Sequence, residues 1–138
     1  MDKKEYQEWE AECNRIRKEN GILLKEFGTW LSKKKLKAKT IASHIDNVSF
    51  YINDFLLYYD VIEAKDGVNS IGDFLGDWFV RKAGWASDAH IKASAASFKK
   101  FYTFLFEKGD IEKSTLIELK ADIKEEMPDW LSNVRSYW

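Results

Sequence analysis

The recurrence of apolar residues every three or four positions, along almost the whole chain, is the feature that most constrains its fold. This spacing places apolar side chains on one face of an α-helix and predicts amphipathic helices. No segment shows the sustained alternation of apolar and polar residues that indicates a β-strand. The chain has one proline, so long helices are rarely interrupted. The sequence therefore predicts an all-α protein.

Residues with known capping preferences bound the expected helices. These helices cover about residues 3–19, 22–35, 41–62, 71–82, 88–108 and 114–126, followed by a helical tail after residue 128. The expected N-caps are Thr40, Ser70 (with Asp73 in a capping-box-like pair) and Ser87. The expected helix ends are Asn20-Gly21, with Gly21 as a left-handed C-cap, Gly109, and Met127-Pro128. Residues 65–67 are expected to form a loop.

The composition indicates a single folded domain over residues 1–138. The chain is 45% hydrophobic and 15% aromatic, which is enough to bury a core. Cys13 is the only cysteine, so an intramolecular disulfide is impossible and a reducing compartment is expected. Neither a signal peptide nor a membrane-spanning segment is visible, so we expect a cytoplasmic protein without a membrane partner.

Three aromatic-rich passages stand out in the sequence, and the first and third of them also contain lysines. They are Leu24–Leu31 followed by Lys34–Leu36 and Lys39–Ile41; Val48–Leu56; and Phe98–Leu105 followed by Lys108–Ile111. Together they resemble the SAM-like, or core-binding, domain of phage integrases and other tyrosine recombinases. The resemblance covers roughly two-thirds of the chain.

The resemblance implies a compact orthogonal helical bundle. Residues 22–111 would form the SAM-like core, residues 1–21 an N-terminal helical extension and residues 112–138 a C-terminal helical extension. In the family this domain clamps one side of duplex DNA, so double-stranded DNA is the expected partner. The chain departs from the pattern at His44, where the family often has Tyr, and lacks the Asn-Pro that often follows the last aliphatic residue.

The catalytic half of the family is not expected here. The 27 residues after Ile111 leave no room for the family's Arg, Lys, His and nucleophilic Tyr. The resemblance therefore implies a non-catalytic, DNA-binding accessory or regulatory protein of DNA recombination and integration.

Basic and small hydroxyl side chains near two helix starts suit phosphate binding, as do the free N–H groups of a helix start. The first set of expected DNA contacts is Lys33, Lys34, Lys35, Lys37, Lys39, Thr40, Ser43 and Asn47. The second set is Lys92, Ser97, Lys99 and Lys100, with Ala93 and Ala96 permitting close approach.

The charge balance leaves a second interpretation open. The net charge is −1, and lysines also gather on solvated helix ends for solubility. Asp46 and Asp88 lie near the lysines in sequence and would repel phosphate. The alternative function is a protein–protein interaction or dimerisation module of the same fold that has lost DNA binding, with a recombinase or a second copy as its partner.

Aromatic residues near both ends of the chain need cover from water. This possible interface comprises Tyr6, Trp9, Trp130, Leu131, Val134, Tyr137 and Trp138. One interpretation is that the tail folds back, for example onto the stripe Tyr6–Trp9–Cys13–Ile16. The other is that these residues form a homodimer or partner surface.

No pattern in the sequence indicates catalysis. His44, His90 and Cys13 are too far apart in sequence to predict a metal site. There is no Gly-rich phosphate loop and no nucleophile motif. We therefore expect a protein that is not an enzyme, with no cofactor, no metal and no small-molecule substrate.

Overall fold

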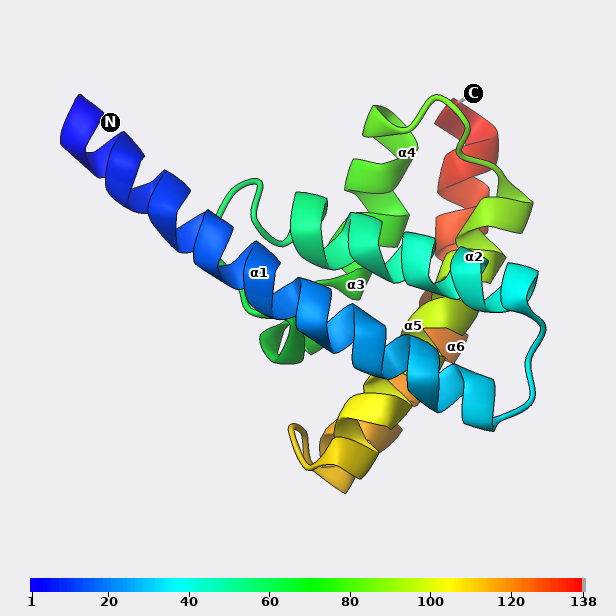
Figure 1. Cartoon of the computed structure of the whole chain (residues 1–138). Helices are drawn as coiled ribbons and strands as arrows, with labels where there is room; N and C mark the ends of the chain where they lie inside the picture. Colours follow the sequence, from blue (N-terminus) through cyan, green and yellow to red (C-terminus); the bar gives the residue numbers. More distant parts are fainter. Residues whose placement is uncertain (138) are drawn as a thin grey trace. The chain divides into compact units, whose positions relative to one another are not determined.

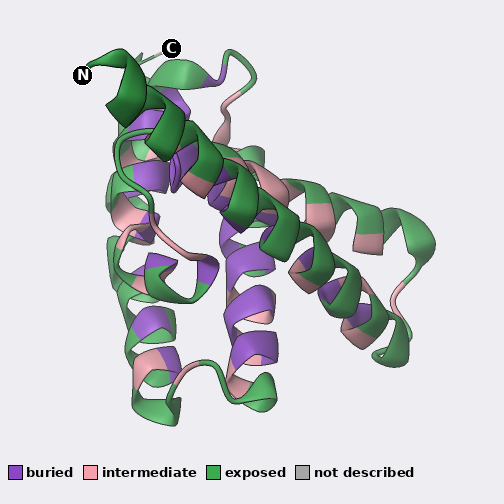
Figure 2. Ribbon diagram, turned by 60° about the vertical axis from the view of Figure 1, so that its left-hand side comes forward, coloured by how far each residue is buried: buried purple, intermediate pink, exposed green. Residues whose placement is uncertain are grey.

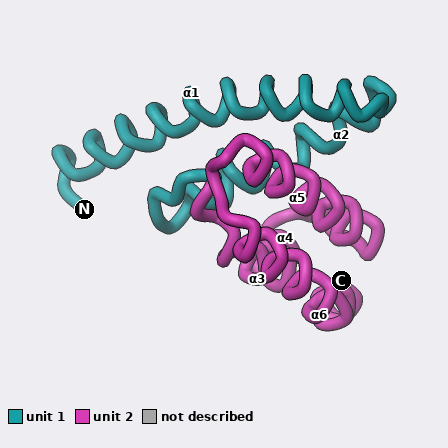
Figure 3. Tube along the Cα trace, turned by 90° about the horizontal axis from the view of Figure 1, so that it is seen from below, with its two compact units in different colours: residues 1–64 teal, residues 65–138 magenta. Residues whose placement is uncertain are grey.

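The computed structural model describes residues 1–137, and every regular element within them is helical (Figure 1). The chain divides into two compact units, residues 1–64 (unit 1) and residues 65–138 (unit 2), which are coloured separately in Figure 3. The all-α prediction is confirmed. The SAM-like topology and the single domain with two extensions stay predictions.

Unit 1 is a helical hairpin followed by a π-helical turn. Helix α1 (Lys3–Lys33) packs against α2 (Ala38–Ser49) and against η1 (Phe50–Phe55), which continues α2. Four residues connect α1 to α2, so the chain turns back on itself at that point (Figure 1). Most of the surface of α1 is exposed, as Figure 2 shows, and its buried positions are Cys13, Ile16, Asn20, Leu24, Phe27 and Leu31.

The predicted helix break at Asn20-Gly21 is wrong, because α1 runs through it without a left-handed residue. Asn20 is buried, and its Nδ2 donates hydrogen bonds to the Ile52 carbonyl oxygen at 3.3 Å and to Asn53 Oδ1 at 2.9 Å. Asparagine ordinarily favours helix ends. Here its amide bonds to a neighbouring element instead, so the two predicted helices are one.

Helix α2 begins earlier than the sequence predicts. Its N-cap is Lys37, and Thr40 lies inside the first turn, so the predicted Thr40 cap is wrong. Regular α-helix ends at Ser49 rather than near residue 62. In the π-helical turn that follows, the Leu56 N–H donates to the Tyr51 carbonyl oxygen, five residues back, at 3.0 Å. Such a turn inserts one residue and rotates the apolar face of all that follows.

Gly28 allows α1 and α2 to approach closely. A Cβ at this position would lie 3.1 Å from Ile45 Cδ1, which is tighter than ordinary contact. Further back along α1, Cys13 and Ile16 form a buried cluster with Leu57, and Trp9 packs against it. The two contacts hold both halves of α1 to its own unit.

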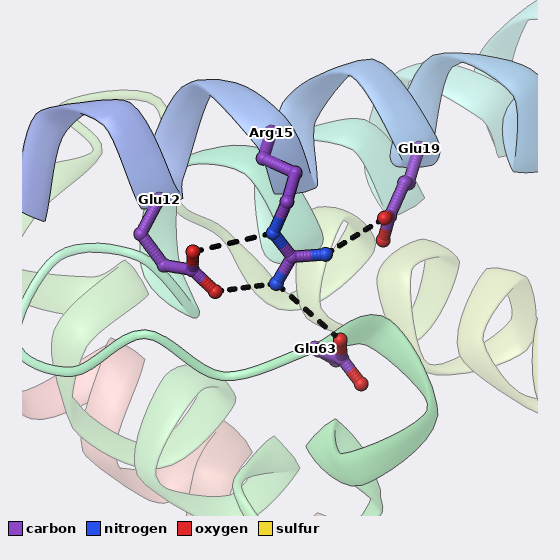
Figure 4. A network of polar contacts seen from close by, with 4 residues as sticks. All are labelled: Glu12, Arg15, Glu19 and Glu63. Atoms are coloured by element: carbon purple, nitrogen blue, oxygen red, sulfur yellow. Dashed lines mark hydrogen bonds and ion pairs between the residues drawn. The ribbon is translucent and has the colours of Figure 1, made fainter.

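A polar network also joins α1 to the end of unit 1 (Figure 4). Arg15 pairs with Glu12 and with Glu19 on α1, and its Nη2 lies 3.8 Å from Glu63 Oε1. The hydrogen bond from Arg15 lowers the pKa of Glu12 below its ordinary value. All four side chains are substantially exposed, so the network adds little stability.

Unit 2 contains a helix with a π-helical turn in its middle and a pair of long helices. The 3-10 helix η2 (Ala64–Asn69) stands where residues 65–67 were predicted to be a loop. It leads into α3 (Ile71–Asp73), η3 (Phe74–Trp78) and α4 (Phe79–Lys82), which follow one another without a gap. Helices α5 (Asp88–Lys108) and α6 (Lys113–Tyr137) pack together, and α6 also contacts α3, η3 and α4.

An aromatic cluster forms part of the core of unit 2. The ring centroid of Phe74 lies 5.8 Å from Trp78, 5.3 Å from Phe79 and 5.8 Å from Phe98 on α5. Rings at these separations attract one another beyond their buried area. The cluster therefore joins α5 to the helix that contains η3.

In unit 2 both predicted boundaries of α5 are confirmed. Ser87 caps α5 by accepting a hydrogen bond from the His90 N–H at 3.3 Å, and Gly109 ends α5 with φ +94°. Ser70 is the N-cap residue of α3, as predicted, but its side chain makes no capping bond, so the predicted capping-box-like pair with Asp73 is wrong.

The predicted break at Met127-Pro128 is also wrong, because α6 continues to Tyr137 with Pro128 inside it. Proline removes one helical hydrogen bond and ordinarily ends a helix. Beyond it, however, Trp130 and Val134 are buried, and Asn133 Nδ2 donates to the Gly76 carbonyl oxygen at 3.0 Å. Packing against η3 thus holds the final turns in helical form.

Candidate nucleic-acid interface

The connection between α1 and α2 carries a cluster of exposed lysines at one end of the hairpin. We name this cluster the basic tip; it comprises Lys33, Lys34, Lys35, Lys37 and Lys39, all of them exposed. The last turn of α1, the connection itself and the first turn of α2 supply them. The first set of predicted phosphate-binding lysines therefore lies on one continuous, solvent-facing turn.

The backbone of the turn is fixed by the way α1 ends. The Lys34 N–H donates to the Leu31 carbonyl oxygen and the Lys35 N–H to the Ser32 carbonyl oxygen, each at 3.0 Å. Lys35 takes the left-handed conformation with φ +64°, and Leu36 is half-buried. This pattern of short hydrogen bonds and one left-handed residue is typical of helix C-termini.

The start of α2 presents backbone N–H groups without a side-chain cap. Lys37 at the N-cap makes no side-chain hydrogen bond, and the first turn contains no acidic residue. Uncapped N–H groups at a helix start favour anions. The basic tip therefore combines lysine charges with backbone donors.

The remaining predicted contacts of this set lie along α2. Thr40 and Ser43 are exposed, whereas Asn47 is half-buried. Ser43 Oγ donates to the Lys39 carbonyl oxygen at 3.1 Å, so its proton is used within the helix. Thr40 is accordingly the best placed of the three to donate to a phosphate.

The sequence around the basic tip contains basic residues and no acidic ones. The 19 residues from Phe27 to Ile45 contain five lysines and no aspartate or glutamate. Within the described residues, none of the five pairs with a carboxylate; Lys34 Nζ instead lies 4.9 Å from the centre of the Trp30 ring. Asp46, predicted to oppose phosphate, is exposed one residue beyond this stretch.

The second predicted set lies on α5, in unit 2. Lys92 is exposed, and Lys99 and Lys100 are half-buried. Ser97 is fully buried and donates to the Ala93 carbonyl oxygen at 3.0 Å, so its prediction as a phosphate contact is wrong. Its small hydroxyl is buried against its own helix rather than open to solvent.

Asp88, the second acidic residue predicted to oppose phosphate, is paired. Arg135 donates to it, with Nε at 2.9 Å from Oδ2, and the pairing raises the pKa of Arg135. The guanidinium offsets the negative charge at the start of α5. Asp88 therefore opposes phosphate less than a lone carboxylate would.

The possible interface residues differ in how far they are exposed. Trp130 and Val134 are buried, Leu131 and Trp9 are half-buried, and Tyr6 and Tyr137 are exposed; Trp138 lies outside the described residues. The tail packs on η3 of its own unit, while Cys13 and Ile16 pack with Leu57 of theirs. In each unit, a partner would meet the exposed and half-buried members of this set.

Sequence reasoning missed one concave surface in unit 2. A cavity of about 500 Å³ lies between the residues around α3 and those of α6. Its apolar lining includes Leu119, Ile123 and Trp130, and its acidic lining comprises Asp73, Asp122, Glu125 and Glu126. The acidic residues of α6 appear in the sequence only as polar positions of a helix, so no local pattern marks the cavity.

Three further observations bear on chemistry. Burial raises the pKa of the Cys13 thiol, which lies in the core of unit 1. Among residues 1–137 there is no group of three or more His, Cys, Asp or Glu placed to hold a metal ion. No helix in this part of the chain is both long and apolar enough to cross a membrane.

Comparisons with protein families, with curated proteins and with solved structures find no match to this chain.

Proposed function

We propose that this chain binds double-stranded DNA through the phosphate backbone, with the basic tip as its principal contact surface. The observation that carries the proposal is the exposure of the five lysines of the basic tip. The stretch from Phe27 to Ile45, which includes the tip, contains no acidic residue. Phosphate contacts by lysine supply most of the affinity of sequence-independent DNA binding.

The role we propose is that of a non-catalytic accessory or regulatory protein. It rests on the resemblance of residues 22–111 to the core-binding domain of tyrosine recombinases, in which the helix after the basic connection is a DNA-contacting element. Here that helix is α2, which opens with uncapped N–H groups. The chain would occupy recombination or operator sites, or compete with an integrase for them.

A salt titration tests the proposal. Binding to a fluorescent 25-base-pair duplex is measured by anisotropy between 50 and 300 mM salt, where about five phosphate contacts predict a log–log slope of about −4 to −5. In the triple variant Lys33→Glu, Lys35→Glu, Lys37→Glu we expect affinity to fall at least a hundredfold, because contacts become repulsions. Absence of binding by the unmodified chain at low salt contradicts the proposal.

A matched control separates the basic tip from overall charge. The variant Lys4→Glu, Lys18→Glu, Lys25→Glu changes the net charge equally, on exposed positions of α1 outside the tip. We expect it to lose much less affinity than the tip variant. Equal losses in the two variants would indicate binding by net charge rather than by the tip.

The lysines of α5 are tested separately. Exchange of Lys92, Lys99 and Lys100 for Gln removes charge from unit 2 and leaves the basic tip intact. A shallower salt slope is expected if these residues also contact phosphate. An unchanged slope would restrict the proposed interface to unit 1.

A further inference from the structure

Lys35 occupies a position whose backbone conformation suits glycine. Among residues 1–137 it is the only residue other than glycine with a positive φ, at +64°. The left-handed conformation brings the Cβ of an L-residue close to backbone atoms, so glycine, and less often asparagine, is the usual occupant just after a helix. The hydrogen bonds of Lys34 and Lys35 to the last turn of α1 fix this conformation.

The side chain of Lys35 gives the fold nothing that offsets this strain. It is exposed, and among the described residues it pairs with no carboxylate. The half-buried residue of the turn is its neighbour Leu36. Both the geometry and the burial of the turn would therefore be served equally well, or better, by glycine at position 35.

The position of Lys35 in the basic tip supplies a reason for the lysine. It lies between Lys34 and Lys37, in the stretch from Phe27 to Ile45 that lacks acidic residues. We propose that Lys35 is a phosphate-contacting residue, held in a left-handed conformation at the expense of folding stability. This inference rests on the proposed DNA binding and names one contact within it.

Three variants of Lys35 separate charge from backbone strain. Lys35→Gly removes both, Lys35→Gln removes the charge alone, and Lys35→Arg keeps both. We expect the melting temperature to rise by about 2–5 °C in the glycine variant and to change little in the other two.

The expected binding results follow charge rather than stability. The glycine and glutamine variants should each lose about five- to tenfold in DNA affinity at 0.1 M salt, with a salt slope shallower by about 0.9, as for one lost phosphate contact. The arginine variant should bind like the unmodified chain. Lys25→Gln, an exposed charge loss on α1 outside the tip, should also leave affinity nearly unchanged.

The outcomes distinguish this inference from the proposed function. If the unmodified chain binds DNA but the glycine and glutamine variants bind equally well, Lys35 is not a phosphate contact and only this inference fails. If the glycine variant gains no stability, the claim of strain at position 35 is wrong. If the unmodified chain does not bind DNA, the proposed function fails and the inference fails with it.

Discussion

At the scale of the residue, two glycines show how closely the helices of each unit approach. A Cβ at Gly28 would press on Ile45 in unit 1, and a Cβ at Gly76 would lie 2.8 Å from Trp130 Cδ1 in unit 2. Neither glycine has a positive φ, so both are required by close contact and not by turn geometry. Nothing in the local sequence distinguishes these glycines from Gly21, which has open space around it.

Gly76→Ala should destabilise the protein by about 1–3 kcal/mol, because the added methyl group overlaps a large ring that is packed in the core. Gly72→Ala is the matched control, since its nearest neighbour is the carboxylate of Glu126 at 3.5 Å, the far end of a flexible side chain. We expect the control to be neutral or stabilising. Urea unfolding of both variants measures the difference, and equal stabilities would contradict the packing of Trp130 on η3.

At the scale of the element, α1 and α6 are longer than their sequence signals predict, and the helices are less regular. Helix α1 passes through Asn20-Gly21 and α6 passes through Pro128, while two π-helical turns, η1 and η3, interrupt the regular spacing. Both helices continue because a side chain hydrogen-bonds to a residue distant in sequence. In α1 this bond joins Asn20 to Ile52, and in α6 it joins Asn133 to Gly76. The carbonyl oxygens of both π-helical turns accept these side-chain hydrogen bonds.

Gly21→Ala tests the continuity of α1. In the middle of an exposed helix, alanine should stabilise the protein by about 0.5–1 kcal/mol, because glycine loses more backbone entropy on folding. If Gly21 were a left-handed C-cap, as its sequence signal predicts, the same exchange would destabilise by a similar amount or more. The sign of the change in thermal stability therefore decides between the two.

At the scale of the whole molecule, the positions of the charged residues matter more than their sum. A net charge of −1 conceals a stretch in unit 1 with five lysines and no acidic residue, and an acidic cavity lining in unit 2. A nucleic-acid partner responds to the local field of such a stretch within about a Debye length, ~8–10 Å. Net charge is accordingly a poor guide to this chain's partners.

Deletion of residues 128–138 tests whether the tail is part of the core of unit 2. Loss of Trp130 and Val134 should destabilise the protein by at least about 3 kcal/mol, because a buried tryptophan alone contributes that much. Circular dichroism melts measure the loss, with Tyr137→Ala, an exposed position, as a control expected within about 0.5 kcal/mol of the unmodified chain. A fully stable deletion variant would instead point to a surface role for the tail.

Part of the candidate site could be predicted from the sequence and part could not. The lysines of the basic tip are exposed as predicted, since charged side chains at the end of an amphipathic helix rarely find a buried partner. Ser97 was predicted as an exposed donor but is buried. Its hydroxyl donates to the carbonyl oxygen of Ala93 on the same helix, and nothing in the sequence distinguishes such a buried serine from an exposed one. The left-handed Lys35 lacks the glycine signal that usually marks such a position.

The sequence by itself determined that the chain is helical, where the α5 caps lie, and that a basic stretch separates two helices, because these depend on neighbours within a few residues. Tertiary structure alone decided that α1 is one helix, that α6 continues past Pro128, and that Gly76 lies against Trp130. Those outcomes turn on hydrogen bonds and ring contacts between residues about 30 to 60 positions apart, and free energies of a few kcal/mol from such contacts exceed the local preferences of single residues.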